Sequence, residues 1–331
     1  DPFTELTSRR STGRTFGAVA TDYIQSMQAG WRNEKHQAQW RMTLLGEIGK
    51  LDKDGKPIKA AIDYCAALRK RPVADINTDD VLKVLKPIWT AKAETARRIR
   101  GRIERVLDAA KAAGERAGEN PARLRGHLDL MLPKSERLQR GHHAAMPYAE
   151  IPAFLAKIRA AGGTASRALK FLILTAARSG EVRGATWDEI QDDLWVIPAS
   201  RMKAQREHRV PLTEAAQAIL DQLRSKSTSR LIFPGWKTNV PLSDMSLTAV
   251  MRRHGAGQYT AHGFRSAFRD WCGDCTSYPR EVAEAALAHA VGDAVERAYR
   301  RGDALEKRRA LMQDWTNYCA GGADGTAAKG V

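Results

Sequence analysis

A stretch rich in proline, glycine and basic residues divides the chain into two halves with different patterns. Residues 118–147 contain Pro121, Pro133 and Pro147, several glycines and many cations, but no sustained apolar periodicity. Segments of this kind connect domains. A single hydrophobic core rarely grows beyond roughly 250 residues, and the chain has 331. We therefore expect two domains joined by a basic linker at 126–147.

The first half is predicted to be all-helical. Apolar side chains recur at helical spacing in two early segments and again on either side of a break near Pro87. Thr15 suits an N-cap, because its hydroxyl can accept from an amide of the first helical turn. We expect an N-terminal extension at 1–14 and a helical domain at 15–125, with helices at 15–30 and 33–48 and a short and a long helix within 76–115.

The long helix is expected to have two distinct faces. Its apolar residues follow spacings of four, three and four, which gives a stripe that faces the core: Ile99, Ile103, Val106 and Ala110. Arginines recur in the same rhythm one position earlier, and such a basic face suits a phosphate backbone. Most charged helix faces are merely solvated, so that alternative stays open. The arginines assigned to DNA contact are Arg97, Arg98, Arg102 and Arg105.

The second half is predicted to be mainly helical with a small β-sheet. Residues 167–178 are apolar nearly all round, which is typical of a buried helix. Two strand-like runs, 194–198 and 208–212, are joined by residues that suit a hairpin turn, and a third strand is expected at 231–234. Further helices are expected at 214–224, 244–254, 263–274, 279–288, 292–301 and 303–317. This domain spans 148–319, and residues 320–331 are expected to be disordered.

The charge balance favours a polyanionic partner. Lysine and arginine number 54 against 38 aspartate and glutamate residues, a formal net charge of +16, which suits nucleic acid or simply a basic enzyme. No apolar run reaches about 18 residues, so we expect no membrane partner and a cytoplasmic location. Four cysteines suit a reducing compartment, and Cys272 and Cys275 lack the second pair typical of a zinc site.

Four short segments follow in chain order with residues suited to phosphate chemistry. They are TAARSGEVRGATW with Arg178, RMKAQREHRVPL with Lys203, TAHGFRSAFRDW with His262 and Arg265, and LAHAVGDAVERAYRR with His289 and Tyr299. Together this set resembles the tyrosine recombinase family, and specifically the P4-type integrases of phages and genomic islands. The resemblance extends from about Thr15 to Tyr318. It implies a two-domain clamp around DNA, with a helical core-binding domain and a catalytic domain of the DNA breaking-rejoining type.

Cleavage of a phosphodiester without a metal needs particular side chains. A tyrosine hydroxyl has a pKa of about 10, so it needs a base or nearby positive charge to act as a nucleophile. The leaving 5′ oxygen needs a proton. Extra negative charge develops on the two non-bridging oxygens, and guanidinium groups match their geometry better than ammonium groups do.

The resemblance assigns a role to each residue of the set and implies a 3′-phosphotyrosine intermediate that needs neither metal nor cofactor. The roles are nucleophile for Tyr299, clamps on the non-bridging oxygens for Arg178 and Arg265, general acid for Lys203, assistance in proton transfer for His262, hydrogen-bond donor to the phosphate for His289, and orienting acid for Glu181.

Alternatives stay open for several of these residues. His262 and His289 could be satisfied core histidines. Tyr278 and Tyr318 are rival tyrosines, although neither follows a histidine at the family distance. The basic residues that compete with Lys203 are Arg201, Arg206 and Lys237, of which Arg201 and Arg206 are also assigned to DNA contact. The helix after Tyr299 either docks on a neighbouring subunit or packs on its own domain.

The predicted function is site-specific DNA recombination that integrates or excises a mobile element. The expected partners are double-stranded DNA attachment sites, other copies of the chain in a tetramer, and a directionality factor, at the nucleoid of a bacterial cell. P4-type integrases ordinarily carry an N-terminal arm-binding domain, and the residues before Thr15 are too few for one. The alternatives are a type IB topoisomerase-like enzyme and a catalytically silent architectural DNA-binding protein.

Overall fold

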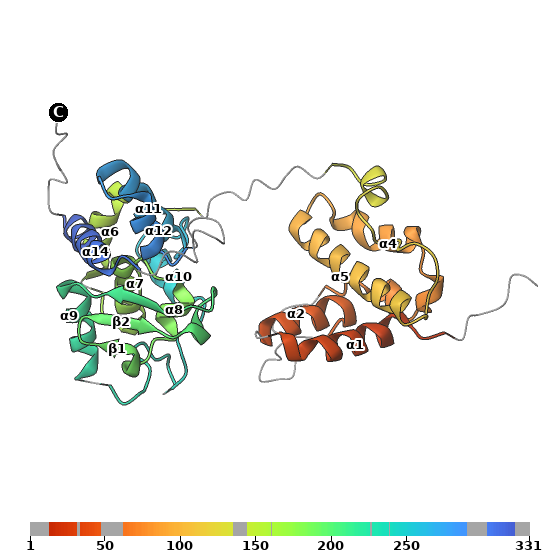
Figure 1. Cartoon of the computed structure of the whole chain (residues 1–331), viewed down its shortest axis with the longest axis horizontal. Helices are drawn as coiled ribbons and strands as arrows, with labels where there is room; N and C mark the ends of the chain where they lie inside the picture. Colours follow the sequence, from red (N-terminus) through yellow and green to blue (C-terminus); the bar gives the residue numbers. More distant parts are fainter. Residues whose placement is uncertain are drawn as a thin grey trace, which may run out of the picture. The chain divides into compact units, whose positions relative to one another are not determined.

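The computed structural model describes residues 13–31, 34–47, 62–134, 144–159, 161–225, 227–237, 239–289 and 303–321. The chain divides into two units, Asp1–Gln139 and Arg140–Val331, each with its own hydrophobic core (Figure 1). The division falls inside the segment expected to be a linker. However, Leu128 and Leu132 pack in the first core, so residues 126–134 belong to the first unit rather than to a linker.

The described part of the first unit is helical, as expected. Helices α1 and α2 pack against each other and against the long helix α5 (Figure 1). The predicted break falls at a 3-10 turn that contains Pro87, whose missing N–H cannot continue a helix. The elements are α1 Phe16–Met27, η2 Gln28–Gly30, α2 Glu34–Leu45, α3 Ala66–Arg69, η3 Val73–Asp75, α4 Thr78–Leu85, η4 Lys86–Ile88, α5 Ala93–Ala112 and η5 Leu128–Leu130.

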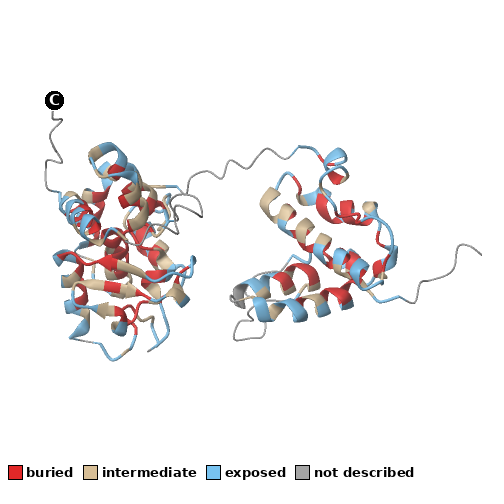
Figure 2. Cartoon of the chain, viewed as in Figure 1, coloured by how far each residue is buried: buried red, intermediate tan, exposed pale blue. Residues whose placement is uncertain are grey.

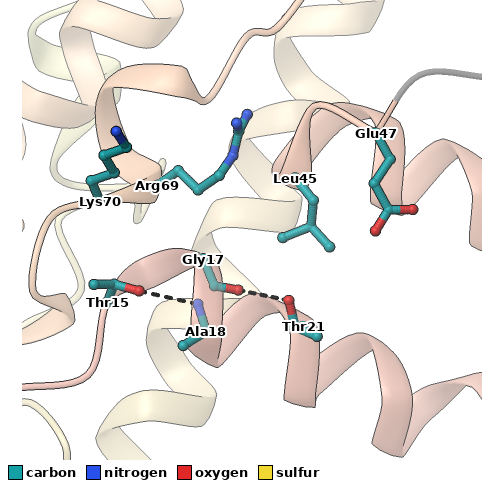
Figure 3. Close-up of a pocket in the computed structure, with 8 residues that line it drawn as sticks. All are labelled: Thr15, Gly17, Ala18, Thr21, Leu45, Glu47, Arg69 and Lys70. Carbon is teal, nitrogen blue, oxygen red and sulfur yellow. Dashed lines mark hydrogen bonds between the residues drawn. The ribbon is translucent and has the colours of Figure 1, made fainter.

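Side-chain caps fix where two of these helices begin. The Thr15 hydroxyl accepts from the backbone N of Ala18 at 3.3 Å, which confirms the predicted cap of α1 (Figure 3). At α4 the Asn77 side chain accepts from the backbone N of Asp80, and the Asp80 carboxylate accepts from the backbone N of Asn77, at 3.1 and 3.2 Å. Each such cap stabilises a helix by about 1 kcal/mol.

The second unit wraps helices around α7 and a small sheet (Figure 1). Helix α7 is buried nearly all round, as its apolar sequence predicted (Figure 2). The helices of this unit are η6 Tyr148–Glu150, α6 Ile151–Arg159, α7 Thr164–Thr175, α8 Ser179–Arg183, η7 Trp187–Glu189, η8 Ala199–Arg201, α9 Glu214–Arg224, α10 Ser246–Arg253, α11 Gly263–Cys275, α12 Arg280–Ala286 and α14 Leu305–Cys319. Helices α7, α9, α10, α11, α12 and α14 lie within three residues of their expected bounds, whereas α6 and α8 were not predicted.

The sheet is antiparallel with strand order β1-β2-β3, formed by β1 Ile190–Gln191, β2 Leu194–Ile197 and β3 His208–Pro211. Trp195 pairs with Val210 across the predicted hairpin, and its buried ring lies 5.3 Å from that of Phe171 on α7. The prediction of a strand at 231–234 is wrong. Leu231 and Pro234 form only isolated bridges, and a proline nitrogen cannot donate to a ladder.

Helix α14 packs on its own domain. Trp315 is fully buried, and its indole N–H donates to the carbonyl of Ile173 on α7 at 2.8 Å. Docking of this segment on a neighbouring subunit stays a prediction. The helix expected at 292–301 and the tail from 322 onward lie outside the described residues, as do residues 1–12.

Candidate active site

Arg178 stands at the start of α8, directly after the turn that ends α7. The Glu181 carboxylate accepts from the backbone N of Arg178 at 2.8 Å and from its Nη1 at 2.7 Å. Glu181 is 6% exposed, so its charge is taken out of water and compensated by this pair. The acid one turn after the arginine thus fixes both the backbone and the guanidinium of Arg178.

Arg265 lies in the first turn of α11 and is 4% exposed. Its Nη1 donates to the carbonyl of Ala176 at 2.6 Å, and its Nη2 donates to the carbonyl of Leu287 at 2.5 Å. Burial, followed by repulsion from Arg178, lowers the pKa of Arg265 to about 10. The guanidinium still carries its positive charge at neutral pH, in a place with little water to screen it.

The two guanidinium groups meet at one turn of the chain. Nη2 of Arg178 lies 3.4 Å from the carbonyl oxygens of both Leu287 and Ala288. The carbonyl of Leu287 also accepts a hydrogen bond from Nη2 of Arg265. Two adjacent planar cations form a site that suits the two non-bridging oxygens of a phosphate. The structure therefore brings together two predicted clamp residues that are far apart in the sequence.

His289 joins this pair through the turn that ends α12. The backbone N of His289 donates to the carbonyl of Glu284, and that of Ala288 donates to Ala285, at 2.9 and 3.0 Å. This is the Schellman arrangement, which turns the chain back over the last helical turn. The His289 ring consequently lies 3.1 Å from Arg265 through Nε2 and 2.7 Å from the Glu284 carboxylate through Nδ1.

Two alanines beside the site adopt the left-handed conformation. Ala176 and Ala288 each have a φ of +49°, which costs a residue with a Cβ roughly 1–2 kcal/mol. Their carbonyls are acceptors for the two arginines. Backbone strain is thus located at the two turns that carry the arginine contacts, as is common at functional sites.

His262 and Lys203 are both exposed. His262 precedes α11, and its carbonyl accepts from the backbone N of Arg265 at 3.1 Å. Lys203 lies in the turn between η8 and β3. No side-chain contact within the described part of the chain joins Lys203 to the arginine pair, so its role stays a prediction.

Arg201, which was expected to contact DNA or to compete with Lys203, is engaged within the protein and holds the hairpin in place; its DNA contact stays a prediction. Its guanidinium donates to both oxygens of the Glu189 carboxylate and to the backbone carbonyl of Glu181. A Cβ on Gly184 would lie 2.9 Å from this guanidinium, so glycine permits the approach. Arg206 is exposed in the same turn and keeps its predicted role as a DNA contact.

The predicted nucleophile, Tyr299, lies outside the described residues, which stop at His289 and resume at Asp303. The Asp303 carboxylate receives Nε and Nη2 of Arg209 at 2.9 and 2.8 Å and Nη2 of Arg308 at 2.6 Å. His289 and Asp303, the two residues that border this segment, therefore both make side-chain contacts within the second unit.

The rival tyrosines are engaged in other parts of this unit. The Tyr278 hydroxyl donates to Asp314 at 2.8 Å, and burial together with that carboxylate raises the pKa of Tyr278 to about 12. Tyr318 packs against Trp271 and Trp315, with ring centroids 5.6 and 5.9 Å apart, and burial raises its pKa as well. A raised pKa makes either phenol a poorer nucleophile.

The basic face expected on α5 is only partly exposed. The apolar stripe is buried as predicted, but Arg102 is 8% exposed and donates to the carbonyl of Gln39 at 2.9 Å and to the Thr43 hydroxyl at 2.6 Å. Arg102 therefore belongs to the packing of α5 on α2. Arg98 is exposed and paired with Glu94, Arg105 is exposed, and Arg97 is partly exposed.

Glu284 and Arg269 are the site residues that the sequence did not single out. Glu284 accepts from the His289 ring and from Nε of Arg269 at 2.8 Å. Desolvation raises the pKa of Glu284, but these two contacts together outweigh it and leave the pKa below its usual value. A helical periodicity does not pair positions five apart, so the only available signal was a glutamate shortly before the candidate histidine.

Other features of the described residues do not add to this site. Cys272 and Cys275 both lie on α11 as free cysteines. Within the described ranges no cluster of metal-ligating side chains occurs, and no helix is long and apolar enough to cross a membrane. A pocket of about 440 Å³ beside the start of α1 belongs to the first unit and contains none of the predicted catalytic residues (Figure 3).

Comparison with known proteins identifies the family of the chain. A model of the phage integrase central domain matches residues 16–127, and a model of the phage integrase family matches residues 146–305. The chain is 33% identical to prophage integrase IntZ of Escherichia coli K12, over 91% of the chain and 70% of that protein. It is 30% identical to the integrase of Enterobacteria phage P4, over 74% of the chain and 60% of that protein.

Solved structures show the same fold. Lambda integrase in a tetramer bound to a Holliday junction has a TM-score of 0.65 at 14% identity, covering 90% of this chain and 80% of that one. The Tn1549 transposon integrase in complex with circular intermediate DNA has a TM-score of 0.55 at 13% identity, covering 87% of this chain and 100% of that one. The helical fold with a small sheet is thus that of DNA integrases.

Proposed function

The chain belongs to the phage integrase family of tyrosine-type site-specific recombinases, and from this premise we propose that its second unit cleaves and rejoins DNA through a bond between Tyr299 and a 3′ phosphate. The observation that carries the proposal is the grouping of Arg178, Arg265 and His289 at one turn. Their proposed ligand is the scissile phosphate, and the proposed outcome is integration or excision of a mobile element.

In the proposed cleavage step, the Tyr299 oxygen bonds to phosphorus while the bond from phosphorus to the 5′ oxygen breaks. His262 assists removal of the phenolic proton, and Lys203 gives a proton to the leaving 5′ oxygen. One phosphoester bond forms for each one that breaks. Attack by the 5′ hydroxyl of another strand reverses the step, so strand exchange needs no nucleotide cofactor.

The arginine pair supplies electrostatic stabilisation in this proposal. Both guanidinium groups are held beside each other by the protein before DNA binds, so they exchange backbone partners for the phosphate without having to be brought together. Each donor of this kind typically contributes about 3–4 kcal/mol in the transition state. Glu181 and the carbonyls of Ala176 and Leu287 orient the pair.

The proposed partners are DNA duplexes and further copies of the chain. The net charge of +16 and the exposed Arg98, Arg105 and Arg206 support binding along phosphate backbones. Assembly into a tetramer is supported by the fold shared with lambda integrase, which forms one on a Holliday junction. We propose action at the nucleoid in the cytoplasm of a bacterium, with a directionality factor that selects excision.

A covalent capture experiment tests the function on duplexes of randomised sequence, so the attachment site need not be chosen in advance. Each duplex is nicked so that the short cleaved product diffuses away, the full chain is added, and SDS-resistant complexes are sequenced. We expect a common sequence with the wild-type chain and no complex with Tyr299→Phe. Binding without any covalent complex would indicate an architectural protein. If supercoiled DNA that carries the captured site is relaxed but never forms a Holliday junction, the chain would be a topoisomerase.

A further inference from the structure

We infer that Glu284 is a positioning residue that fixes the proton on the His289 ring and thereby prepares this histidine to donate to the scissile phosphate. The inference rests on the proposed function, because the phosphate is the group that His289 would meet. It adds a residue that neither the motif positions nor the assigned roles include. Glu284 lies in the last turn of α12 and its side chain is 16% exposed.

The hydrogen-bond partners of the His289 ring define its protonation. Nε2 lies 3.1 Å from Nη2 of Arg265, and a guanidinium can only donate, so Nε2 is the acceptor in this contact. Nδ1 lies 2.7 Å from Oε2 of Glu284, and a carboxylate accepts. The neutral ring therefore carries its proton on Nδ1, the tautomer that Arg265 and Glu284 select together.

This arrangement must change before His289 can donate to a phosphate oxygen. The ring has to take up one proton from solvent at Nε2 while it keeps the proton on Nδ1. The carboxylate of Glu284 stabilises the resulting imidazolium through the Nδ1–H bond. His289 is 44% exposed at its side chain, so solvent can reach the ring. Arg265, freed from Nε2, then turns its donor to the phosphate.

The backbone supports the same role. The Schellman turn brings His289 back over Glu284 and joins the two residues a second time, through the backbone N of His289 and the carbonyl of Glu284 at 2.9 Å. The turn requires Ala288 in the left-handed region, at a φ of +49°. Ala288, the strained residue, stands in the sequence between Glu284 and His289, the histidine whose ring Glu284 orients.

The charged groups that face Glu284 come from α11 and from its own helix, α12. Nε of Arg269 on α11 lies 2.8 Å from Oε1, and Nε of Arg280 lies 3.7 Å from the same oxygen. Arg269 is one helical turn after Arg265. Glu284 thus connects the helix that carries Arg265 to the His289 ring, and Arg269→Gln removes this helix contact while leaving the contact with His289.

The experiment determines the protonation of the His289 ring directly in the full chain. Histidine nitrogens are labelled, long-range proton–nitrogen spectra are recorded without DNA, and the His289 signals are identified by their loss in His289→Gln. We expect the neutral ring to be protonated on Nδ1 in the wild-type chain. In Glu284→Gln, whose amide can accept or donate, we expect a weaker preference for the Nδ1 proton and a larger share of the Nε2-protonated tautomer, although Arg265 still donates to Nε2.

Two variants separate positioning from a structural role. Arg269→Gln is expected to lower the thermal unfolding temperature and to leave the tautomer unchanged, whereas Glu281→Gln, the same charge change one turn earlier on α12, should alter neither. In the covalent capture assay Glu284→Gln should slow adduct formation by about 10-fold or more, by analogy with the loss of a carboxylate that orients a metal-bound histidine.

A wild-type ring protonated on Nε2 would overturn the inference, as would the same tautomer shift in Arg269→Gln as in Glu284→Gln. Adduct formation by Glu284→Gln at the wild-type rate would also overturn it. If the wild-type chain forms no adduct, the proposed function fails, while the spectra still decide whether Glu284 sets the tautomer.

Discussion

Arg178 and Arg265 donate to the same backbone oxygen, that of Leu287, with Nη2 to oxygen distances of 3.4 and 2.5 Å. A carbonyl carries only a partial negative charge, so it holds two cations together less well than a phosphate oxygen would. The carbonyl of Leu287 therefore keeps both guanidinium groups in place without DNA. A phosphate oxygen can replace this carbonyl as their partner when DNA binds.

Replacing either arginine by lysine should nearly abolish cleavage. A lysine cannot form the two contacts that Arg265 makes with Ala176 and Leu287, and it offers a point charge in place of a planar fork. We expect adduct formation by Arg178→Lys and Arg265→Lys to fall at least about 100-fold. Single-turnover rates on a captured nicked duplex measure this, with circular dichroism as the control for folding. A loss below tenfold in both variants would contradict the clamp.

Gly263→Ala should destabilise the second unit. A Cβ there would lie 2.5 Å from the carbonyl oxygen of Ala144 and 2.7 Å from Cα of Ala145, so backbone would have to move. We expect a loss of about 1–3 kcal/mol in the free energy of unfolding. Gly273→Ala on the same helix meets only the end of the Arg269 side chain at 3.4 Å and should be neutral or slightly stabilising. Urea denaturation of both variants compares them, and equal stability would contradict the packing.

Stability should fall as the pH decreases from about 6.5 to about 4, in part because of His208. Burial, followed by repulsion from Arg308, lowers the pKa of His208 from 6.5 to about 4. Between these values the unfolded chain binds a proton that the folded chain does not, so lower pH favours unfolding. The effect is on the order of 3 kcal/mol. His208→Gln should flatten the dependence of unfolding free energy on pH in this window, and an unchanged slope would contradict the lowered pKa of His208.

Arg102 and Arg105 should respond in opposite ways to replacement by alanine. Arg102 packs over the Trp40 ring at 5.3 Å and donates to two groups of α2, so its loss should lower the free energy of unfolding by about 1–3 kcal/mol. Arg105 is exposed on α5, so its loss should weaken DNA binding and reduce its salt dependence. Denaturation and binding titrations at several salt concentrations measure both effects, and the reverse pattern would contradict these two roles.

The sequence predicts elements whose signals are local. The Thr15 cap, the apolar stripe of α5 and the hairpin around Trp195 all follow from residues that lie within one or two turns of one another. The burial of Arg102 depends on α2, which is distant in the sequence. No periodicity of α5 alone distinguishes a buried guanidinium from an exposed one.

The site was predictable as a set of residues but not as a network. The ordered motifs identify Arg178, Arg265 and His289, and the structure brings these three together. The partnership of Glu284 with His289 depends on a left-handed Ala288, and alanine gives no signal for that conformation, unlike glycine. The backbone acceptors likewise have no signature in residue type.

The most direct test of the proposed chemistry identifies the amino acid that becomes joined to DNA. The wild-type chain is trapped on a captured nicked duplex, digested with nuclease and protease, and the peptide that retains a nucleotide is sequenced by mass spectrometry. We expect a nucleotide on Tyr299, linked through a 3′ phosphate. A nucleotide on Tyr278, Tyr318 or any other residue would contradict the proposal.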